Sequence, residues 1–263
     1  MNARHLADLL EAPGPVIGTW AQLETPEAVE LLASSGFDFA IIDTEHTPFG
    51  MDRAQHLLRA AQAVGLAAAV RVPALDRVQV TKALDCGFSA VVVPGIRTAE
   101  EVRVLQRWVR FGEGGDRGAC PCIRAAGQAT ADWDAYATRS DDVVLALPLI
   151  ETRTAVAAIN EILAVEGLRA IVLGPFDLSV AMGYRGDTTA SEVQAALKSV
   201  FSACADAGVT PILPIFALDS AALTQALGAW HGAGVRLFTI GTDKQIFAMA
   251  ARAFVSARDD LSS

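Results

Sequence analysis

Six ionisable side chains stand at or just after the ends of short apolar segments of the sequence. They are Asp43, Glu45 and His46 after FAII, Arg71 in AAAVRVP, Glu151 after VVLALPLI, and Asp177 in IVLGPFDLS. The apolar segments have the composition of buried parallel strands. If the carboxyl ends of these strands meet at one edge of a sheet, the six side chains converge on one site.

Glu151 and Asp177 carry the oxygen ligands that a hard divalent cation prefers. Two carboxylates leave positions for water and for a 2-oxo acid bound through two oxygens, as in an octahedral Mg²⁺ or Mn²⁺ site. Such a cation polarises a keto oxygen and stabilises a carbanion beside it. We therefore expect these two residues to hold a metal for enolate chemistry on pyruvate or a similar 2-oxo acid.

The other residues have roles in the same chemistry. His46 can move a proton near neutral pH, as histidines commonly do in enzymes, and the nearby Asp43 would orient its imidazole. Arg71 would hold the enolate oxygen or a carboxylate, a contact worth roughly 3–4 kcal/mol at a transition state. The turn at Gly174 and Phe176 offers backbone N–H groups to a substrate carboxylate.

Each of these residues also has a purely structural explanation when it is taken alone. An acidic residue after a strand often caps the next helix, and a single histidine is often a satisfied loop residue. Arg71 can also be a salt-bridge partner between neighbouring strands. The convergence of all six at the carboxyl ends of the strands is what favours an active site.

Eight short apolar segments are predicted to be the strands that position these residues. They are Val16–Trp20, Phe39–Ile42, Ala67–Val72, Ala90–Pro94, Val143–Ile150, Ala170–Leu173, Thr210–Ile215 and Arg236–Ile240. Most are apolar along their whole length and rich in β-branched residues, as expected for parallel strands covered on both faces.

Amphipathic segments lie between the predicted strands. Apolar residues recur at helical spacing in Pro26–Ser34, Met51–Val64, Thr154–Ala164, Glu192–Ala205, Ser220–Leu227 and Lys244–Ala257. Thr98 and Glu101 predict a capping box at the start of another helix, and residues 1–14 predict a short amphipathic helix.

This alternation predicts an α/β fold, a (β/α)8 TIM barrel that residues 1–263 form as one domain. The Gly-rich segment Arg110–Asp141 follows the fourth strand, where a barrel places functional loops. We interpret it as a lid or a subunit contact, with a variable surface loop as the alternative.

The composition argues against several classes of partner. Hydrophobic residues make up 52% of the chain, charged residues 19%, and the formal net charge is −9. This acidity argues against nucleic acid and against anionic membrane surfaces as partners. We find no signal peptide and no apolar run of membrane-spanning length, and we expect a cytoplasmic protein.

The rare residue types favour the metal mechanism. The chain has three lysines, Lys82, Lys198 and Lys244, and all fall in helical segments or at a helix start, which argues against a Schiff base on a barrel strand. No P-loop or GxGxxG motif is present, so a nucleotide cofactor is not expected. Cys120 and Cys122 have no second Cys or His pair at ligand spacing, and we interpret them as ordinary reduced thiols.

Together these motifs resemble the metal-dependent pyruvate aldolases of the HpcH/HpaI type, which include 4-hydroxy-2-oxoheptanedioate and 2-dehydro-3-deoxyglucarate aldolases. The similarity lies in GTWAQLETPEAVELLASSGFDFAIIDTEH, AVRVP, KALDCGFSAVVVPGI, LIETRTAV and IVLGPFDLSVAMGYRGD, between about Gly18 and Asp243. The resemblance implies a lyase that reversibly cleaves a 4-hydroxy-2-oxo acid into pyruvate and an aldehyde. It also implies a divalent cofactor such as Mg²⁺, Mn²⁺ or Co²⁺.

The resemblance also implies a role for each matching residue. Glu151 and Asp177 match the metal ligands of the family, and His46 and Asp43 match its acid–base dyad. Arg71 matches the residue that steadies the enolate. The positions that correspond to residues of the pocket, residues that support the pocket and residues of a neighbouring subunit are Trp20, Glu45 and Asp85. Members of this family exchange their last helix between subunits and usually form hexamers. We therefore expect a homo-oligomer, a hexamer or a trimer.

Three features depart from the family pattern, one of which is the absence of the usual Pro-Pro before Arg117-Gly118. The other two lie at the expected site. Leu149 stands where a Gln is common, two residues before the metal-binding Glu, and Phe176 stands where Ala is usual. Leu149 removes a hydrogen-bond donor near the substrates, and Phe176 narrows the pocket. With few other charged residues expected there, the sequence favours a small or apolar aldehyde over a dicarboxylate.

Two other functions are compatible with the fold. A CoA-thioester lyase of the citrate lyase β-subunit or malyl-CoA lyase type needs a basic surface for the CoA phosphates, and we find no Lys/Arg cluster near the expected site. A barrel that binds metabolites without turnover is the second alternative, and it is supported by Leu149 and Phe176 alone.

Overall fold

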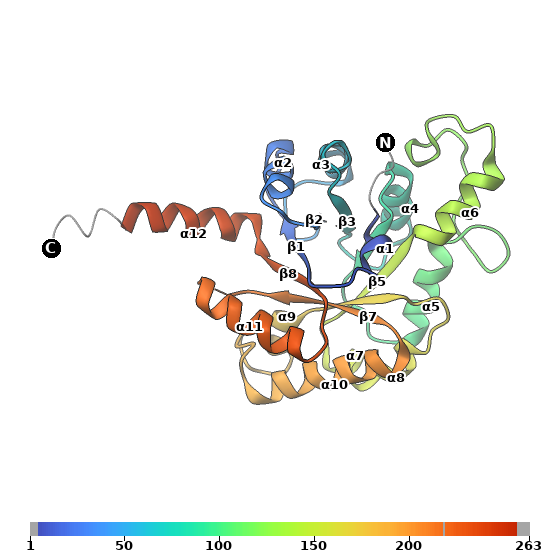
Figure 1. Ribbon diagram of the computed structural model, residues 1–263. Coiled ribbons are helices and arrows are strands. Elements are labelled where there is room, and N and C mark those ends of the chain that lie inside the picture. The colour runs from blue at the N-terminus through green and yellow to red at the C-terminus, as the bar shows by residue number, and fades with distance from the viewer. Residues whose placement is uncertain (1–4, 218, 257–263) are drawn as a thin grey trace.

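The strands form a closed parallel barrel in the computed structural model, which describes residues 5–217 and 219–256 (Figure 1). In chain order they are β1 (Val16–Ala21), β2 (Phe39–Asp43), β3 (Ala67–Arg71), β4 (Ala90–Val93), β5 (Leu145–Ile150), β6 (Ala170–Leu173), β7 (Thr210–Ile215) and β8 (Leu237–Thr242). β1 pairs with β8, with Val16 beside Leu237, and this pairing closes the sheet. The predicted (β/α)8 barrel is confirmed.

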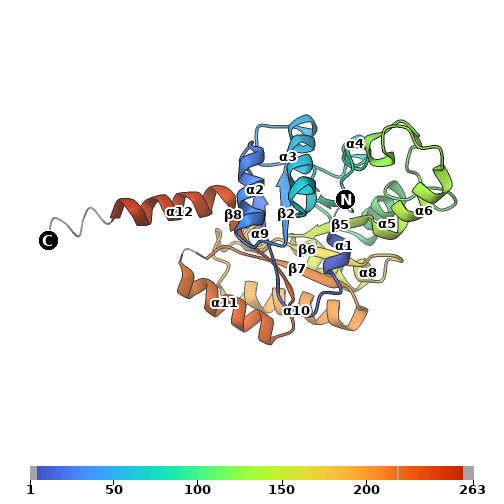
Figure 2. The ribbon, with the colours of Figure 1, turned by 45° about the horizontal axis from the view of Figure 1, so that its top comes forward.

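Helices surround the barrel (Figure 1, Figure 2). They are α1 (Leu6–Leu9), α2 (Pro26–Ser34), α3 (Met51–Val64), α4 (Arg77–Cys86), α5 (Ala99–Trp108), the 3-10 helix η1 (Arg124–Ala126), α6 (Trp133–Val143), α7 (Arg153–Ala157), α8 (Ile159–Leu163), α9 (Pro175–Ala181), α10 (Ser191–Ala207), α11 (Ser220–Gly232) and α12 (Asp243–Ser256). The expected capping box is present, because Thr98 Oγ1 accepts from the Glu101 N–H and the Glu101 carboxylate accepts from the Thr98 N–H.

Apolar side chains fill the inside of the barrel. Gly18 makes room for one of the largest, since a Cβ at Gly18 would lie 2.5 Å from the Phe39 ring. Leu6 and Leu9 of α1 belong to the same buried cluster. Arg236, just before β8, donates to carbonyl groups next to α1, so this helix covers the N-terminal opening of the barrel. The ionisable residues Asp43, Arg71 and Glu151 lie at the opposite opening, at the carboxyl ends of the strands.

Several element boundaries differ from the predicted ones. The helix predicted over Thr154–Ala164 is two short helices, α7 and α8, with Ala158 between them at φ −93° and ψ 11°. β5 begins at Leu145 because α6 continues through Val143. α9 was not expected. The predicted end of the last helix at Ala257 lies outside the described residues.

The segment between α5 and β5 forms a small unit of its own on the barrel surface. Phe111, Tyr136 and Trp133 pack together, with ring centroids 5.0–6.0 Å apart. Arg117 is buried beneath Phe111, with its guanidinium 4.3 Å from the ring centroid, and donates to Tyr136 and Ser140. This packing is that of an ordered segment.

α12 extends away from the barrel (Figure 1). Its apolar residues Phe247 and Phe254 are 69% and 85% exposed, and Asp243 is the buried residue among those described in the helix. None of the helices in the described part of the chain has the length and apolar character of a membrane span.

Candidate active site

The carboxyl ends of β2 and β3 are joined by an ion pair. Asp43 and Arg71 are adjacent across the two strands, and their side chains meet through two hydrogen bonds of 2.8 and 2.7 Å. The Asp43 side chain is fully buried and that of Arg71 is 8% exposed. A two-point contact of this kind fixes the plane of the guanidinium.

Arg71 is held from two further directions. Its Nη1 lies 3.1 Å from Glu45 Oε2, and its guanidinium lies 4.4 Å from the centroid of the Trp20 ring. The Trp20 indole is itself fixed, because its Nε1 donates to Thr239 Oγ1 at 3.0 Å. Trp20 therefore acts as a platform for Arg71.

Asp43 accepts hydrogen bonds from other groups besides Arg71. Gln22, just after β1, donates through Nε2 to Asp43 Oδ2 at 2.8 Å, and the backbone N–H of Glu45 donates to Oδ1. Burial alone would raise the pKa of Asp43, but the hydrogen bonds and charge of Arg71, with these other donors, lower it below its ordinary value. Asp43 is therefore an ionised, fully bonded carboxylate.

Glu151 lies at the opposite side of the barrel opening, just after β5. Its Oε1 accepts from the Gly95 N–H at 2.7 Å. Its side chain packs against Gly174, where an added Cβ would lie 2.5 Å from Glu151 Cβ. Gly174 is thus required for the turn from β6 into α9 to pass close to Glu151. The same turn carries Asp177 in the first turn of α9.

The charges around Glu151 are not balanced. Burial raises the pKa of Glu151 to about 7, and the neighbouring carboxylates of Asp177 and Glu45 add to the increase. Burial also raises the pKa of Glu45, with Asp43 and Asp177 contributing, although Arg71 acts in the other direction. Three carboxylates therefore influence one another in this part of the opening.

This arrangement fits a divalent cation. Glu45 Oε2 is buried and lies 3.1 Å from Arg71 Nη1 without an aligned hydrogen bond. Glu151 and Asp177, whose charges interact with Glu45 and with each other, supply hard oxygen donors. Positive charge placed between them would relieve the repulsion that raises the pKa of Glu151. Among the described residues, no group of three or more His, Cys, Asp or Glu side chains has the arrangement of a metal site.

His46 and Asp43 do not make the side-chain contact that we expected. Asp43 is occupied by Arg71 and Gln22, and its bond to residue 46 is to the backbone N–H at 3.4 Å. The imidazole Nε2 lies 3.9 Å from Glu45 Oε2, and the His46 side chain is 60% exposed. The acid–base pairing of His46 with Asp43 stays a prediction.

A cavity of about 530 Å³ opens above these residues. It is lined by Trp20, Gln22, His46, Arg71, Leu149, Leu173, Gly174, Pro175, Phe176, Asp177, Gly186, Thr188, Pro214, Phe216, Thr242 and Gln245. The sequence interpretation missed Gln22, Phe216 and Gln245, because a polar or aromatic residue after a strand is a weak signal by itself. The Gly174 N–H donates to Ile150 O at 2.9 Å. Of the two expected backbone donors, only Phe176 remains for a substrate.

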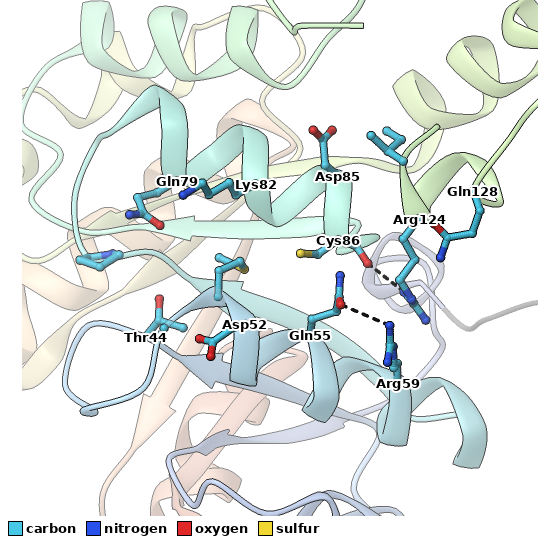
Figure 3. A pocket seen from close by; sticks show the side chains of 14 residues that line it. Thr44, Asp52, Gln55, Arg59, Gln79, Lys82, Asp85, Cys86, Arg124 and Gln128 are labelled. Carbon is cyan, nitrogen blue, oxygen red and sulfur yellow. Dashed lines mark hydrogen bonds between the residues drawn. The ribbon is translucent and has the colours of Figure 1, made fainter. Parts of the chain in front are cut away.

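Asp85 lies outside this cavity. It is on α4 and lines a second, polar cavity of about 760 Å³ between α3, α4 and the segment around Arg124 (Figure 3). The side chain points away from Gln55, and its Oδ1 lies 4.0 Å from Arg117 (Figure 3). Within one subunit, Asp85 is therefore separate from the residues around Arg71.

Comparisons with known proteins show the family to which the chain belongs. The model of the HpcH/HpaI aldolase/citrate lyase family matches residues 16–248. The chain belongs to this family, and it is an enzyme of the lyase class. A 4-hydroxy-2-oxo-heptane-1,7-dioate aldolase from Shigella sonnei is 34% identical over 247 residues, which cover 94% of this chain and 92% of the relative.

Two further comparisons cover most of the chain. A 2-dehydro-3,6-dideoxy-6-sulfogluconate aldolase from Pseudomonas putida is 34% identical over 201 residues, 76% of this lyase and 78% of the relative. The crystal structure of an HpcH/HpaI aldolase from Desulfitobacterium hafniense superimposes with a TM-score of 0.89 at 28% identity, covering 97% and 96% of the two chains.

Proposed function

We propose that this lyase is a divalent-metal-dependent aldolase. It reversibly cleaves a 4-hydroxy-2-oxo acid into pyruvate, or a similar 2-oxo acid, and an aldehyde. The observation that carries the proposal is the group of mutually repelling carboxylates at Glu151, Glu45 and Asp177. Of these, Asp177 lines the cavity that the fixed Arg71 also lines. The relatives named as aldolases support the reaction class.

Glu151 and Asp177 would hold Mg²⁺, Mn²⁺ or Co²⁺. When bound, the cation supplies positive charge that favours the enolate form of the 2-oxo acid. The half-buried Glu45 carboxylate adds negative charge that acts on both Glu151 and Asp177, which favours cation binding. The substrate and water complete the coordination.

Arg71 stabilises the negative charge that develops on the substrate. Its guanidinium is fixed by Asp43 and by the Trp20 ring before substrate binds. A donor that does not reorganise during the reaction stabilises the transition state most effectively. The Phe176 N–H, in the first turn of α9 where helical N–H groups lack internal acceptors, binds the substrate carboxylate.

His46 moves the proton. In the cleavage direction the imidazole takes the proton of the C4 hydroxyl, the C3–C4 bond breaks, and its electron pair forms the enolate while C4 becomes the aldehyde carbonyl. The imidazolium then releases its proton to water, and a proton from water adds to C3 and gives the methyl group of pyruvate. The exposure of His46 at the cavity allows it to reach the aldehyde-derived oxygen.

The assembly is the second part of the proposal. The exposed apolar side chains of α12 support a homo-oligomer, a hexamer or a trimer, in which this helix packs on a neighbouring subunit. Asp85 would then face the cavity of a neighbouring subunit. We place the enzyme in the cytoplasm. Light scattering on the wild-type protein and on the Phe247→Ser variant tests the assembly, and a monomeric wild type would contradict it.

Proton–deuterium exchange at the pyruvate methyl group tests the chemistry. We expect exchange that depends on added Mg²⁺ or Mn²⁺ and stops in excess chelator. The measurement follows enolate formation without any aldehyde, so it does not depend on the choice of acceptor. Full exchange in the presence of chelator would contradict the metal mechanism.

A further inference from the structure

The cavity is lined by a charged group of residues, here called the floor, and by an apolar group, here called the wall. The floor carries Arg71 and Asp177, together with His46. The wall consists of Leu149, Leu173, Pro175, Phe176, Pro214 and Phe216. These come from the ends of β5, β6 and β7 and from the start of α9, so the apolar residues form one continuous side of the opening.

Two aromatic rings of this wall are open to solvent. Phe176 is 51% exposed and Phe216 is 41% exposed. A ligand group that covers these rings removes apolar surface from water, which favours binding by about 25 cal/mol for each Å². A polar or charged group in the same place would lose its water without a new partner.

The Phe176 ring is fixed by its surroundings. Gly186 passes directly beneath it, and a Cβ at Gly186 would lie 2.7 Å from the ring. The Phe176 carbonyl accepts a hydrogen bond from Ser179 Oγ at 2.6 Å, which anchors the same residue from the helix side. Because Phe176 adjoins Asp177, the ring lies next to the position of the reacting groups.

The described lining of the cavity offers no unpaired arginine or lysine for a second acidic group. Among the described residues that line it, the basic side chains are Arg71 and His46. Arg71 is already bonded to Asp43 and paired with Glu45. Asp177 adds negative charge on the same side. A second carboxylate on the aldehyde would therefore meet an apolar wall and repelling carboxylates.

From these observations we propose that the aldehyde substrate carries an apolar chain, which binds against Phe176 and Phe216. The inference rests on the proposed aldolase function and names its acceptor class. The aldehyde carbon lies over the floor near His46, and the carbon chain extends along the wall. The two aromatic residues are the specificity-determining residues of this enzyme.

A matched pair of aldehydes tests the inference. Butanal and succinic semialdehyde have the same number of carbons and differ in the terminal group, and hexanal extends the apolar chain. With pyruvate and the metal-loaded wild-type enzyme, we expect kcat/KM for butanal to exceed that for succinic semialdehyde at least about tenfold, with hexanal higher again. A preference for succinic semialdehyde would overturn the proposal.

Substitutions of Phe176 and Phe216 test whether these two rings cause the preference for apolar aldehydes. In Phe176→Ala and Phe216→Ala we expect the hexanal to succinic semialdehyde ratio of kcat/KM to fall about tenfold. Phe216→Lys, which supplies a cation, should lower the ratio further by improving succinic semialdehyde. The ratio is measured within each variant, so changes in folding or metal loading cancel. Val180→Ala is the control, because Val180 is a 52% exposed residue of α9 outside the cavity lining.

The outcomes separate the inference from the proposed function. Pyruvate methyl exchange without turnover of any of these aldehydes would overturn the inference and leave the aldolase chemistry in place. The absence of exchange with every metal would overturn the proposed function itself. A ratio that does not change in Phe176→Ala and Phe216→Ala would contradict the assignment of the two rings.

Discussion

The two sides of the barrel opening shift the pKa of a buried carboxyl in opposite directions. On the β2–β3 side, every Asp43 oxygen is bonded, and Arg71 lowers the pKa of this buried carboxyl despite the cost of burial. On the β5–β6 side, burial raises the pKa of Glu151 to about 7, and Asp177 adds to the increase. The Asp43 carboxylate on the β2–β3 side therefore has a charge partner, whereas the Glu151 carboxylate on the β5–β6 side is not paired with a positive charge in this way.

The difference has opposite consequences for stability. Asp43 has a folded-state pKa below its unfolded value, so its contribution is present at neutral pH and is lost as the pH falls through the folded value. Glu151 has a folded-state pKa above its unfolded value of 4.5, so its contribution is present at low pH and is lost as the pH rises through about 7. The ion pair stabilises the β2–β3 side at neutral pH, whereas the ionised Glu151 destabilises the β5–β6 side there.

Removal of Arg71 should have the largest effect, because it destroys the balanced side. Arg71→Ala leaves Asp43 fully buried without its charge partner, and we expect a loss of about 3–5 kcal/mol in the free energy of unfolding. Pyruvate exchange should fall roughly 100- to 1000-fold, because the fixed donor is lost. Denaturant unfolding and the exchange assay measure the two effects.

Arg53→Ala is the matched control for this variant. Arg53 pairs with Glu24 at 2.9 Å, but both side chains are well exposed, at 59% and 43%. An exposed ion pair contributes at most about 1 kcal/mol. Equal destabilisation by the two arginine variants would show that the Asp43–Arg71 pair has no special place in the fold.

Neutralisation of Glu151 should act on stability in the other direction. Glu151→Gln keeps an acceptor for the Gly95 N–H and removes a carboxylate that is repelled by Asp177. At pH 8 the metal-free variant should be more stable than the wild type, on the order of 1 kcal/mol. Metal-dependent exchange should fall on the order of 100-fold, because a ligand charge is lost.

Asp142→Asn is a control for the loss of one negative charge far from the opening, since Asp142 lies at the end of α6. It should change neither metal-free stability nor exchange. If Glu151→Gln destabilises the metal-free protein as much as Arg71→Ala does, the carboxyls of the two sides do not contribute to stability with opposite sign.

Metal affinity should depend on pH through Glu151. Its pKa is raised to about 7, and only the ionised form binds a cation, so binding below pH 7 releases a proton. The dissociation constant for Mn²⁺ should rise about tenfold for each pH unit below 7 and level off above it. Calorimetric titration at pH 6 and pH 8 measures both the affinity and the released proton. An affinity that is the same at the two values would contradict the raised pKa.

The barrel and the position of its ionisable residues could be predicted because they follow from local patterns. Apolar parallel strands end where polar residues begin, and all carboxyl ends of a closed parallel sheet face one way. This rule is enough to place Arg71 and Glu151 at the same opening from the sequence alone. It says nothing about which side chains pair.

The pairing depends on contacts between distant segments. Asp43 meets Arg71, 28 residues away, because β2 and β3 align these two residues side by side. His46 is much nearer in sequence, but the chain has already left the strand there, so its ring is directed elsewhere. Gln22 and Asp243 were missed for the same reason, since their partners lie on other strands or across the closure of the barrel.

Removal of the Gln22 side chain should have the smallest effect of these variants. It tests how far the lowered pKa of Asp43 depends on Arg71 alone. Gln22→Ala removes one donor from Asp43 Oδ2 and leaves both bonds from Arg71. We expect a loss of about 1 kcal/mol in the free energy of unfolding. Because the Gln22 hydrogen bond helps to lower the pKa of Asp43, its loss should raise that pKa and move acid unfolding to higher pH.

Gln245→Ala is the matched control for Gln22→Ala. Gln245 also lines the cavity, but its Nε2 donates at 3.4 Å to the Ala217 carbonyl and contacts no carboxylate of the β2–β3 side. This variant should leave the midpoint of acid unfolding unchanged. A shift of the midpoint in Gln245→Ala but not in Gln22→Ala would mean that the acid sensitivity of the opening does not arise at Asp43. The contrast between the two sides would then lose its basis, because it assigns the acid-sensitive contribution to Asp43.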